Sequence, residues 1–419
     1  MSRSNGRWRM LALIGTASTG WVVTPAWAEP APAFAQLLQQ AASSPRVEAL
    51  DADVARAEGL ARQAEVRPNP TVSVMAENFA GGAPFGSYNR AETTVQYAQP
   101  IEIGGKRSAR IAYGTAGVMA ARAHSHAGRV AYAYELAMAY ADAEISQRRV
   151  GLVEDEIEEA QEDLRIARAM VVAGKDSRLR QLQAETALNT LEADLQGAKA
   201  QQTGALARLS ALSGSETPFT SVGESLLGRL ATPAVMGPPD PMANPAWLAA
   251  DADRKAAEAR VRAEHRRGNP DVTVILGARR LEAEGATAMV AGLSVPLPLF
   301  DRNRGNIAAA EAEHRGAEAR ERAAQLEAQA AQNAAQANVA AAQAQVRAAK
   351  MSLASAQEAY RLSHIAYQGG KIPLSEVLAA RHGLGTARGA VLDAETARFK
   401  ATAQAAALAG YSIAGDQIP

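Results

Sequence analysis

The chain has 419 residues and no cysteine, which excludes a disulfide framework, thiolate zinc sites, iron–sulfur clusters and a cysteine nucleophile. Its 44 basic residues balance 44 acidic ones, so it lacks the basic excess typical of nucleic-acid-binding domains, and we expect no nucleic-acid partner. Only 5% of the residues are aromatic and alanine is abundant, a composition that favours long, closely packed helices over a compact α/β enzyme.

The first 28 residues have the organisation of a secretory signal peptide. Arg3, Arg7 and Arg9 precede an apolar run over residues 10–23, and residues 26–28 form an A-x-A cleavage site. Cleavage there removes three basic residues and no acidic ones, which leaves a mature chain with a net charge of −3. We therefore expect the mature chain to be exported.

The mature chain is an internal duplication. Residues 45–70 align without gaps to residues 245–270 at an offset of 200, and after the strands the offset becomes 196. Each half is predicted to run helix, strand, strand, long helix, turn, long helix. We expect a first repeat over 29–213, a proline-rich crossover over 214–244, a second repeat over 245–410 and a C-terminal tail over 411–419.

Each half contains two short segments with strand character, at about 71–79 and 91–99 and at about 271–280 and 286–295. In the first segment Val72 and Val74 alternate with Ser73 and Glu77, which predicts one apolar and one polar face. Strands of this kind suit the wall of a transmembrane barrel, although a half-buried sheet in a soluble domain would show the same alternation in any one strand. Four strands cannot close a barrel alone, so an oligomer is implied.

Two helical hairpins follow the strands, predicted over 105–213 with a tip near 173–176 and over 304–410 with a tip near 369–373. Apolar residues recur every seven positions, from Leu136 to Val171 and again from Val339 to Tyr367, which predicts a coiled-coil seam. A proline-free helix over 106–173 would reach roughly 100 Å, a length suited to a conduit or spacer. The alanine-rich tract 323–350 could instead be a disordered low-complexity segment, but its continuous register favours helix.

The strand-to-helix junctions carry the most specific motifs, QPIEIGGKR at 99–107 and PLPLFDRNRG at 296–305. With the signal peptide and the duplicated halves, they resemble the heavy-metal (CzcC-like) branch of the TolC family of outer-membrane efflux channels, over essentially the whole mature chain. This resemblance implies a mainly α fold with membrane β-structure: a homotrimeric periplasmic α-helical barrel continuous with a 12-stranded outer-membrane β-barrel. The junction residues expected to turn each strand into a helix are Pro100, Gly104, Gly105, Pro296 and Pro298.

The same resemblance implies a function and partners. The chain would be a passive exit duct in the outer membrane of a Gram-negative cell, surrounded by outer-membrane lipid and extending into the periplasm. It would serve a tripartite exporter together with an inner-membrane RND pump and a periplasmic adaptor, and its cargo would be divalent heavy-metal cations. A duct of the same fold for drugs or for type I protein secretion is the alternative. A periplasmic adaptor would show one coiled hairpin, whereas this chain has two.

The hairpin tips carry the candidate functional residues. Gly174, Lys175, Gly370 and Lys371 mark the chain reversals, where the resemblance implies that the adaptor docks. Relatives carry two acids just beyond the second tip in a D-V-L-D-like stretch. The stretch at 375–379 reads SEVLA, so it keeps only the first acid, Glu376. Three copies would bring one carboxylate ring to a closed aperture that opens by untwisting of the tips; an exposed helix-face glutamate is the alternative.

Equivalent positions of the two repeats carry opposite charges. Arg180 corresponds to Glu376, and Glu185 corresponds to Arg381. If the two hairpins lie side by side, such charges could tether them and hold the aperture shut, although exposed ion pairs contribute only about 0–1 kcal/mol each.

No catalytic constellation, phosphate-binding loop or cofactor motif is present in the sequence. The six histidines are scattered, and the closest two, His124 and His126, would point about 200° apart on a helix, which makes a poor metal chelate. We therefore predict no catalytic residue, no cofactor and no metal site, and we do not expect an enzyme.

Overall fold

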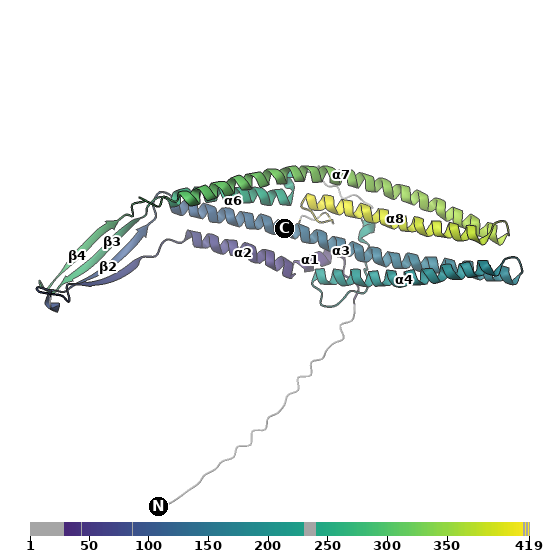
Figure 1. Ribbon diagram of the computed structural model, residues 1–419, viewed down its shortest axis with the longest axis horizontal. Coiled ribbons are helices and arrows are strands. Elements are labelled where there is room, and N and C mark those ends of the chain that lie inside the picture. The colour runs from purple at the N-terminus through teal and green to yellow at the C-terminus, as the bar shows by residue number, and fades with distance from the viewer. Residues whose placement is uncertain are drawn as a thin grey trace, which may run out of the picture.

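The computed structural model describes residues 29–413 except 43, 86 and 230–239, together with residues 415 and 418. The expected signal peptide, the centre of the expected crossover and much of the C-terminal tail lie outside the described residues. The molecule is elongated, with a β-sheet at one end and the turns of two helical hairpins at the other (Figure 1).

Both halves contain the same order of elements. The first half holds α1 (Phe34–Ala41), α2 (Pro45–Glu65), β1 (Thr71–Glu77), the 3-10 turn η1 (Tyr88–Arg90), β2 (Glu92–Ile101), α3 (Lys106–Val172) and α4 (Arg178–Ser213). After α5 (Leu226–Arg229) and η2 (Pro241–Ala243), the second half holds α6 (Pro245–Arg267), β3 (Val272–Leu281), β4 (Ala286–Ser294), α7 (Arg304–Gln368) and α8 (Leu374–Leu408). The predicted duplication of helix, strand, strand and long helical hairpin is confirmed. β1 ends two residues before the expected position 79, because Asn78 takes a positive φ of 59° and leaves the strand conformation.

The four strands form one antiparallel sheet in the order β1-β2-β3-β4. The register pairs Val74 with Val95 between β1 and β2, and Tyr97 with Leu276 between β2 and β3. It pairs Ala278 with Met289 between β3 and β4. Within the described sheet, β1 and β4 are therefore edge strands whose outer backbone groups have no neighbouring strand.

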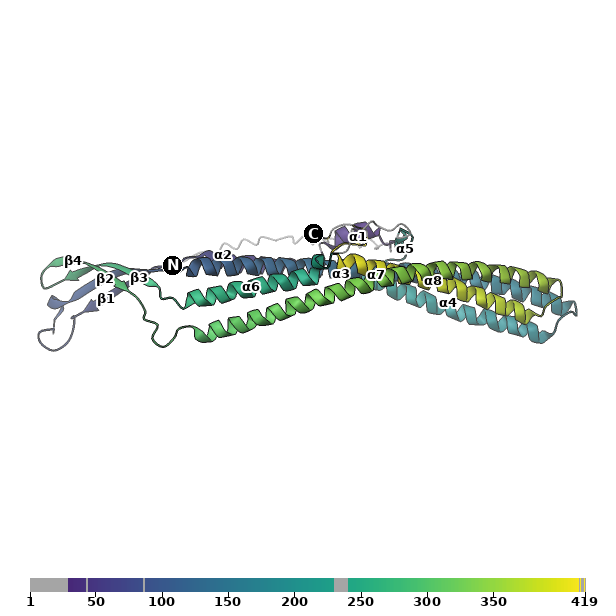
Figure 2. The ribbon, with the colours of Figure 1, turned by 90° about the horizontal axis from the view of Figure 1, so that it is seen from above.

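The helices form a layer that continues from the sheet. Near the sheet, α2, α3, α6 and α7 lie side by side in that order, and each packs against the next (Figures 1 and 2). Toward the tips, α3 packs against α4 and α8, and α7 packs against α8. The tract 323–350 lies inside α7, so it is helical as its register predicts. Among the described residues, every helix falls short of the combined length and hydrophobicity that a bilayer-spanning helix requires.

The apolar core sits in two places along this layer. A cluster at the middle of the molecule joins α1, α3, α4 and α8 through residues such as Phe34, Leu136, Leu209 and Phe399. A second cluster near the tips joins both hairpins; its members include Leu164, Ala167, Ala184, Leu374 and Val377. The predicted seam of α3 is buried at Leu136, Ala143, Val150 and Leu164, so the seven-residue pattern identifies the packed face of this helix correctly.

Candidate functional site

One face of the sheet is apolar and uncovered in the single chain. The register places Val72, Tyr97, Leu276 and Ala291 in one row across the strands, and Val74, Val95, Ala278 and Met289 in the next. The exposed fractions are large, 69% for Val72 and 83% for Met289. A contiguous apolar surface of this kind indicates an apolar neighbour.

The opposite face of the sheet carries a cluster of polar side chains from β1, β2 and β3. Arg279 on β3 lies at its centre: its Nη1 is 2.9 Å from Oε2 of Glu92, and its Nη2 is 3.4 Å from Oε2 of Glu77. Its Nε donates a hydrogen bond of 3.0 Å to Oγ1 of Thr94. The two faces of the sheet therefore differ. One is apolar in its central rows, and the other carries this polar cluster beside apolar residues of β3 and β4 such as Ile275 and Val290. The alternation predicts the polar face in β1 and β2 only.

The strand-to-helix junctions are built differently in the two halves. Gly104 and Gly105 have φ of 69° and 78°, and a Cβ on Gly104 would lie 2.5 Å from Nδ2 of Asn269. A left-handed φ favours glycine at both positions, and the close contact with Asn269 adds crowding at Gly104. In the second half Asn303, with φ of 58°, takes the place of Gly105 directly before the long helix; asparagine is among the few other residues that adopt this conformation.

Two of the three expected junction prolines lie outside the strands and the third lies inside one. Pro296 and Pro298 lie in the segment between β4 and α7, as expected. Pro100 instead lies within β2, just past Ala98, the last residue that pairs with β1. A proline is tolerated there because part of the ladder has already ended.

The two hairpin tips have the same hydrogen-bonding pattern. The backbone N–H of Lys175 donates to the carbonyl of Met170 (2.9 Å), and that of Lys371 donates to the carbonyl of Ala366 (2.9 Å). Gly174 and Gly370 sit inside these turns with φ of 69° and 72°. This is the Schellman arrangement that ends a helix through a left-handed glycine. Both tips are exposed and lie at the same end of the molecule (Figure 1).

A buried polar network joins the two hairpins near the tips, on the side toward the sheet. Asp163 on α3 and Arg381 on α8 are only 2% and 8% exposed, and Nε of Arg381 lies 3.2 Å from Oδ2 of Asp163. Tyr360 on α7 donates from its hydroxyl to Oδ1 of Asp163 at 3.4 Å. Farther along, Arg388 donates to Glu159 at 2.8 Å. Charged groups of α3 and α8 and a hydroxyl of α7 thus meet between the hairpins, and the Asp163–Arg381 pair is the buried part of the network.

Burial has the largest effect on the pKa values of Asp163 and Tyr367. It raises the pKa of Asp163 from 3.8 to about 6, although the neighbouring Arg381 and His364 favour the charged carboxylate. Burial also raises the pKa of Tyr367 to about 12, together with the nearby carboxylate of Asp176, to which the Tyr367 hydroxyl donates a 3.2 Å hydrogen bond. Burial thus moves the pKa of the Asp163 carboxyl toward neutral pH.

Three of the four predicted aperture residues, Arg180, Glu185 and Arg381, have partners that the sequence does not indicate. Glu376 is exposed in the first turn of α8. Arg180 pairs with Asp176 at 3.9 Å, and Glu185 pairs with Arg168 at 2.9 Å. Arg381 is buried against Asp163 because α8, besides packing on α7 in its own hairpin, packs on α3 more than on α4. Among the described ion pairs of the chain, neither Arg180–Glu376 nor Glu185–Arg381 is formed, so the predicted tether between the two hairpins is not seen and stays a prediction.

Asp163 is the residue that sequence reasoning missed. It immediately precedes Leu164, a residue of the predicted seam, so it flanks the packed face of α3. A charged residue that flanks a packed helix face indicates an ion pair with another helix. The sequence does not indicate that the partner is Arg381, because the internal repeat does not relate positions 163 and 381.

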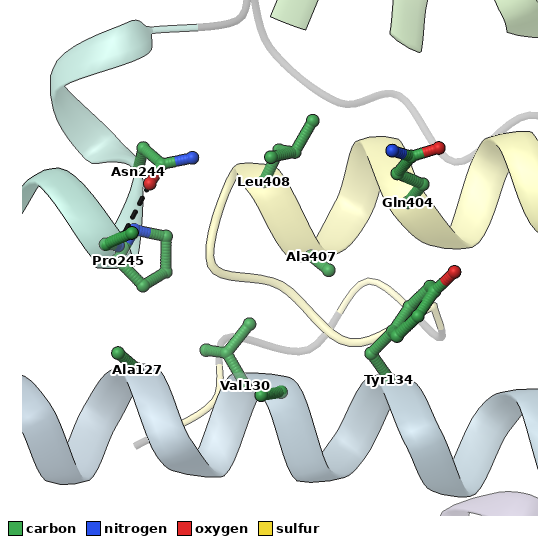
Figure 3. Close-up of a pocket in the computed structure, with 10 residues that line it drawn as sticks. Ala127, Val130, Tyr134, Asn244, Pro245, Gln404, Ala407 and Leu408 are labelled. Carbon is green, nitrogen blue, oxygen red and sulfur yellow. Dashed lines mark hydrogen bonds between the residues drawn. The ribbon is translucent and has the colours of Figure 1, made fainter. Parts of the chain in front are cut away.

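An open hollow at the middle of the molecule is lined mainly by apolar side chains of α3 and α8 and by the start of α6 (Figure 3). Its polar side chains are Tyr134, Gln404 and Asn244, and the last of these caps α6 by accepting from the backbone N–H groups of Ala246 and Trp247. Because the lining residues include no carboxylate, histidine, lysine or arginine, this hollow offers no general acid or base of that kind.

The histidines stay apart from one another. Nε2 of His124 lies 2.9 Å from Oδ2 of Asp253, while Nε2 of His126 lies near Gly410. Within the described part of the chain, no group of three or more histidine, cysteine, aspartate or glutamate side chains is arranged to hold a metal ion.

The sequence matches the model of one protein family, described as outer membrane efflux protein, over residues 37–215 and 242–411. It is 40% identical over 283 residues to the nickel-cobalt-cadmium resistance protein NccC of Alcaligenes xylosoxydans xylosoxydans; the match covers 67% of this chain and 64% of NccC. It is also 40% identical over 282 residues to the nickel and cobalt resistance protein CnrC of Cupriavidus metallidurans, covering 67% of each chain. The chain thus spans slightly less than two thirds of the length of NccC.

Solved structures with this fold include two outer-membrane proteins. The Vibrio cholerae protein VceC superposes with a TM-score of 0.74 at 22% identity, over 90% of this chain and 96% of VceC. CusC superposes with a TM-score of 0.77 at 16% identity, over 90% of this chain and 92% of CusC. At these identities the likeness establishes the fold.

Proposed function

Because the chain belongs to the outer membrane efflux protein family, we propose that three copies of it form a passive exit duct that carries divalent heavy-metal cations out through the outer membrane. The observation that carries this proposal is the shape of the chain: a sheet with one apolar and one polar face lies at one end, and exposed hairpin tips lie at the other (Figure 1). A chain of this shape can place its sheet in an apolar layer while its hairpin tips reach a distant partner in the aqueous phase. The cargo is inferred from the likeness to NccC and CnrC, whose names refer to nickel, cobalt and cadmium.

The homotrimer follows from the open edges of the sheet. β1 and β4 each have one unpaired side, and pairing β4 of one copy with β1 of the next joins three four-stranded sheets into a closed ring. Such closure directs the polar face with Arg279 toward an enclosed aqueous path and leaves the apolar face for lipid. The duct needs no chemistry of its own, and it is not an enzyme.

The distant end of the duct would meet its protein partners. Gly174, Lys175, Gly370 and Lys371 are exposed at the hairpin tips, which is where a periplasmic adaptor would dock. The adaptor in turn would connect the duct to an inner-membrane RND pump, which supplies the energy for export. A duct of this kind could also serve drug efflux or protein secretion, so the cargo needs a direct test.

Deletion of the gene, followed by complementation with the full chain, tests the cargo. We expect the deletion strain to lose growth on nickel, cobalt or cadmium salts while its tolerance of dyes and detergents stays unchanged. Greater sensitivity to dyes and detergents with unchanged metal tolerance would favour the drug-efflux alternative. Loss of a secreted protein would favour type I secretion.

The aperture at the tips is proposed to be lined by Glu376. Its carboxylate is exposed in the first turn of α8, and three copies would focus a negative potential that attracts cations. In planar bilayers, Glu376→Ala should lose cation selectivity. Asp155→Ala, which removes an exposed acid far from the tips on α3, serves as the matched control and should keep it. Equal selectivity in both variants would refute the carboxylate ring.

A further inference from the structure

The internal repeat is visible in space as well as in sequence. One unit consists of α2, β1, β2 and α3, and the other of α6, β3, β4 and α7. Within the chain the two units meet through β2 against β3 and through α3 against α6. The opposite sides stay open: β1 and α2 form one edge of the molecule, and β4 and α7 form the other (Figures 1 and 2). A second copy can repeat at this edge the contact that the two units make inside the chain.

One ion pair crosses the contact between α3 and α6 along the helices. Nε2 of His124 lies 2.9 Å from Oδ2 of Asp253. The offset of 196 between α3 and α7 makes Arg320 the counterpart of His124, and the offset of 200 between α2 and α6 makes Asp53 the counterpart of Asp253. Both counterparts lie on the helices that form the open edges, α7 and α2.

Packing supports this alignment of the helices. Gly114 of α3 lies so close to α2 that a Cβ would be 3.0 Å from Cα of Ala61. The residue at offset 196 from Gly114 is Ala310, which is fully buried in the second unit. A small residue therefore occupies the equivalent position in both units, Gly114 against α2 in the first and the buried Ala310 in the second.

Both counterpart residues are available in the single chain. The Asp53 side chain is 66% exposed and contacts only Arg56, one turn farther along its own helix, at 3.4 Å. Arg320 is exposed, and no described residue forms an ion pair or a hydrogen bond with it. A further charged pair between the units, Lys106–Asp271 at 2.9 Å, has no such copy, because Thr71 stands where the repeat would need an acid.

From this juxtaposition we propose that Arg320 on α7 of one copy pairs with Asp53 on α2 of the next, so that a second copy of this chain covers each helical edge. The inference rests on the proposed trimer and assigns its helical interface to named residues.

Cysteine crosslinking of the full chain tests the pair. The chain has no cysteine, so Asp53→Cys/Arg320→Cys carries only the two introduced thiols. A short bis-maleimide added to the purified protein in detergent should produce dimer and trimer bands on denaturing gels. His124→Cys/Asp253→Cys is the internal control and should crosslink without leaving the monomer position. Asp51→Cys/Arg320→Cys is the register control, because Asp51 faces Arg129 of its own unit.

Light scattering on the same samples separates the possible failures. A trimeric protein that gives no crosslinked oligomer, or gives as much with Asp51→Cys as with Asp53→Cys, would overturn the pair while leaving the proposed duct intact. A monomeric protein would overturn both. As a second readout, Asp53→Arg should reduce the trimer fraction, and Asp53→Arg/Arg320→Asp should restore it; lack of restoration would argue against the pair.

Discussion

The buried pair of Asp163 and Arg381 is the most consequential contact between single residues near the tips. A guanidinium and a carboxylate in a nearly dry contact lose much of their hydration, and only their mutual attraction and nearby hydrogen bonds compensate. Such a pair adds little net stability compared with apolar side chains, but loss of one partner leaves the other charge buried without a counterion. The pair therefore acts mainly as a constraint on how the two hairpins can separate.

Truncation of Asp163 should reveal this constraint. Asp163→Ala leaves Arg381 buried without a counterion, so we expect a loss of about 3–5 kcal/mol. The double variant Asp163→Leu/Arg381→Met should recover most of it, because it removes both charges. Thermal unfolding followed by circular dichroism measures the effect, with Asp155→Ala as the exposed control. Equal stability of Asp163→Ala and the control would contradict a buried ion pair.

The pH dependence of the tips should follow Asp163. Its pKa in the folded protein, about 6, lies above the value of 3.8 for an exposed aspartate, so the folded state holds the proton more tightly. The resulting stabilisation is complete below about pH 4 and is lost as the pH rises through about 6, at roughly 1 kcal/mol per pH unit in between.

Asp163→Asn isolates this effect, because His364, Glu159 and Arg381 remain around it. Between about pH 5 and about pH 7, the wild-type protein should lose thermal stability relative to Asp163→Asn. Parallel pH profiles for the two proteins would assign the titration to another group.

At the scale of the elements, the hairpin turns depend on one glycine in each tip. Gly370 has a φ of 72°, whereas its neighbour Gly369 has a φ of −77°, which any residue can adopt. Gly370→Ala should cost about 1–2 kcal/mol, because an L side chain in the left-handed region crowds its own backbone. Gly369→Ala should be neutral. Thermal unfolding of the two variants measures the difference, and equal costs would show that the turn does not require the left-handed residue.

The elements were largely predictable from the sequence because their signals are local. Seven-residue periodicity marks the packed face of α3, two-residue alternation marks β1, and glycine marks both tips. The choice of partners was not predictable in the same way. Arg381 is brought to Asp163 by the packing of α8 on α3, and two helices separated by about half of the chain carry no joint sequence signal.

Glu144 shows the same limit at the crossover. It is buried in α3 and accepts hydrogen bonds from the backbone N–H groups of Leu226 and Leu227, at 2.8 and 3.1 Å. It thereby holds α5 against the long helix. The sequence does not show that this glutamate, one of many in α3, will bind distant backbone groups. Every residue except proline carries a backbone N–H, so no residue type marks the donor.

At the scale of the whole molecule, the duplicated chain explains why the sheet and the helical layer share their open edges. Each unit contributes two strands and the helices that continue from them, so a contact between strands is also a contact between helices. The repeat in the sequence predicts this shared geometry. It does not predict which edge residues pair, since His124 and Arg320 occupy equivalent places with different chemistry.

The two faces of the sheet provide the sharpest test of how the assembled molecule sits in a bilayer. Met289 belongs to the apolar face and Val290 to the opposite one, at the middle of β4. Arginine on a lipid-facing strand costs about 2–4 kcal/mol near the bilayer midplane, while a residue facing the aqueous path pays no such penalty. Met289→Arg should therefore reduce the trimer recovered from outer-membrane fractions, and Val290→Arg should leave it near the wild-type amount. In a sheet exposed to water on both faces, the more exposed Met289 would be the more tolerant position, so the reverse ranking would refute the proposed orientation.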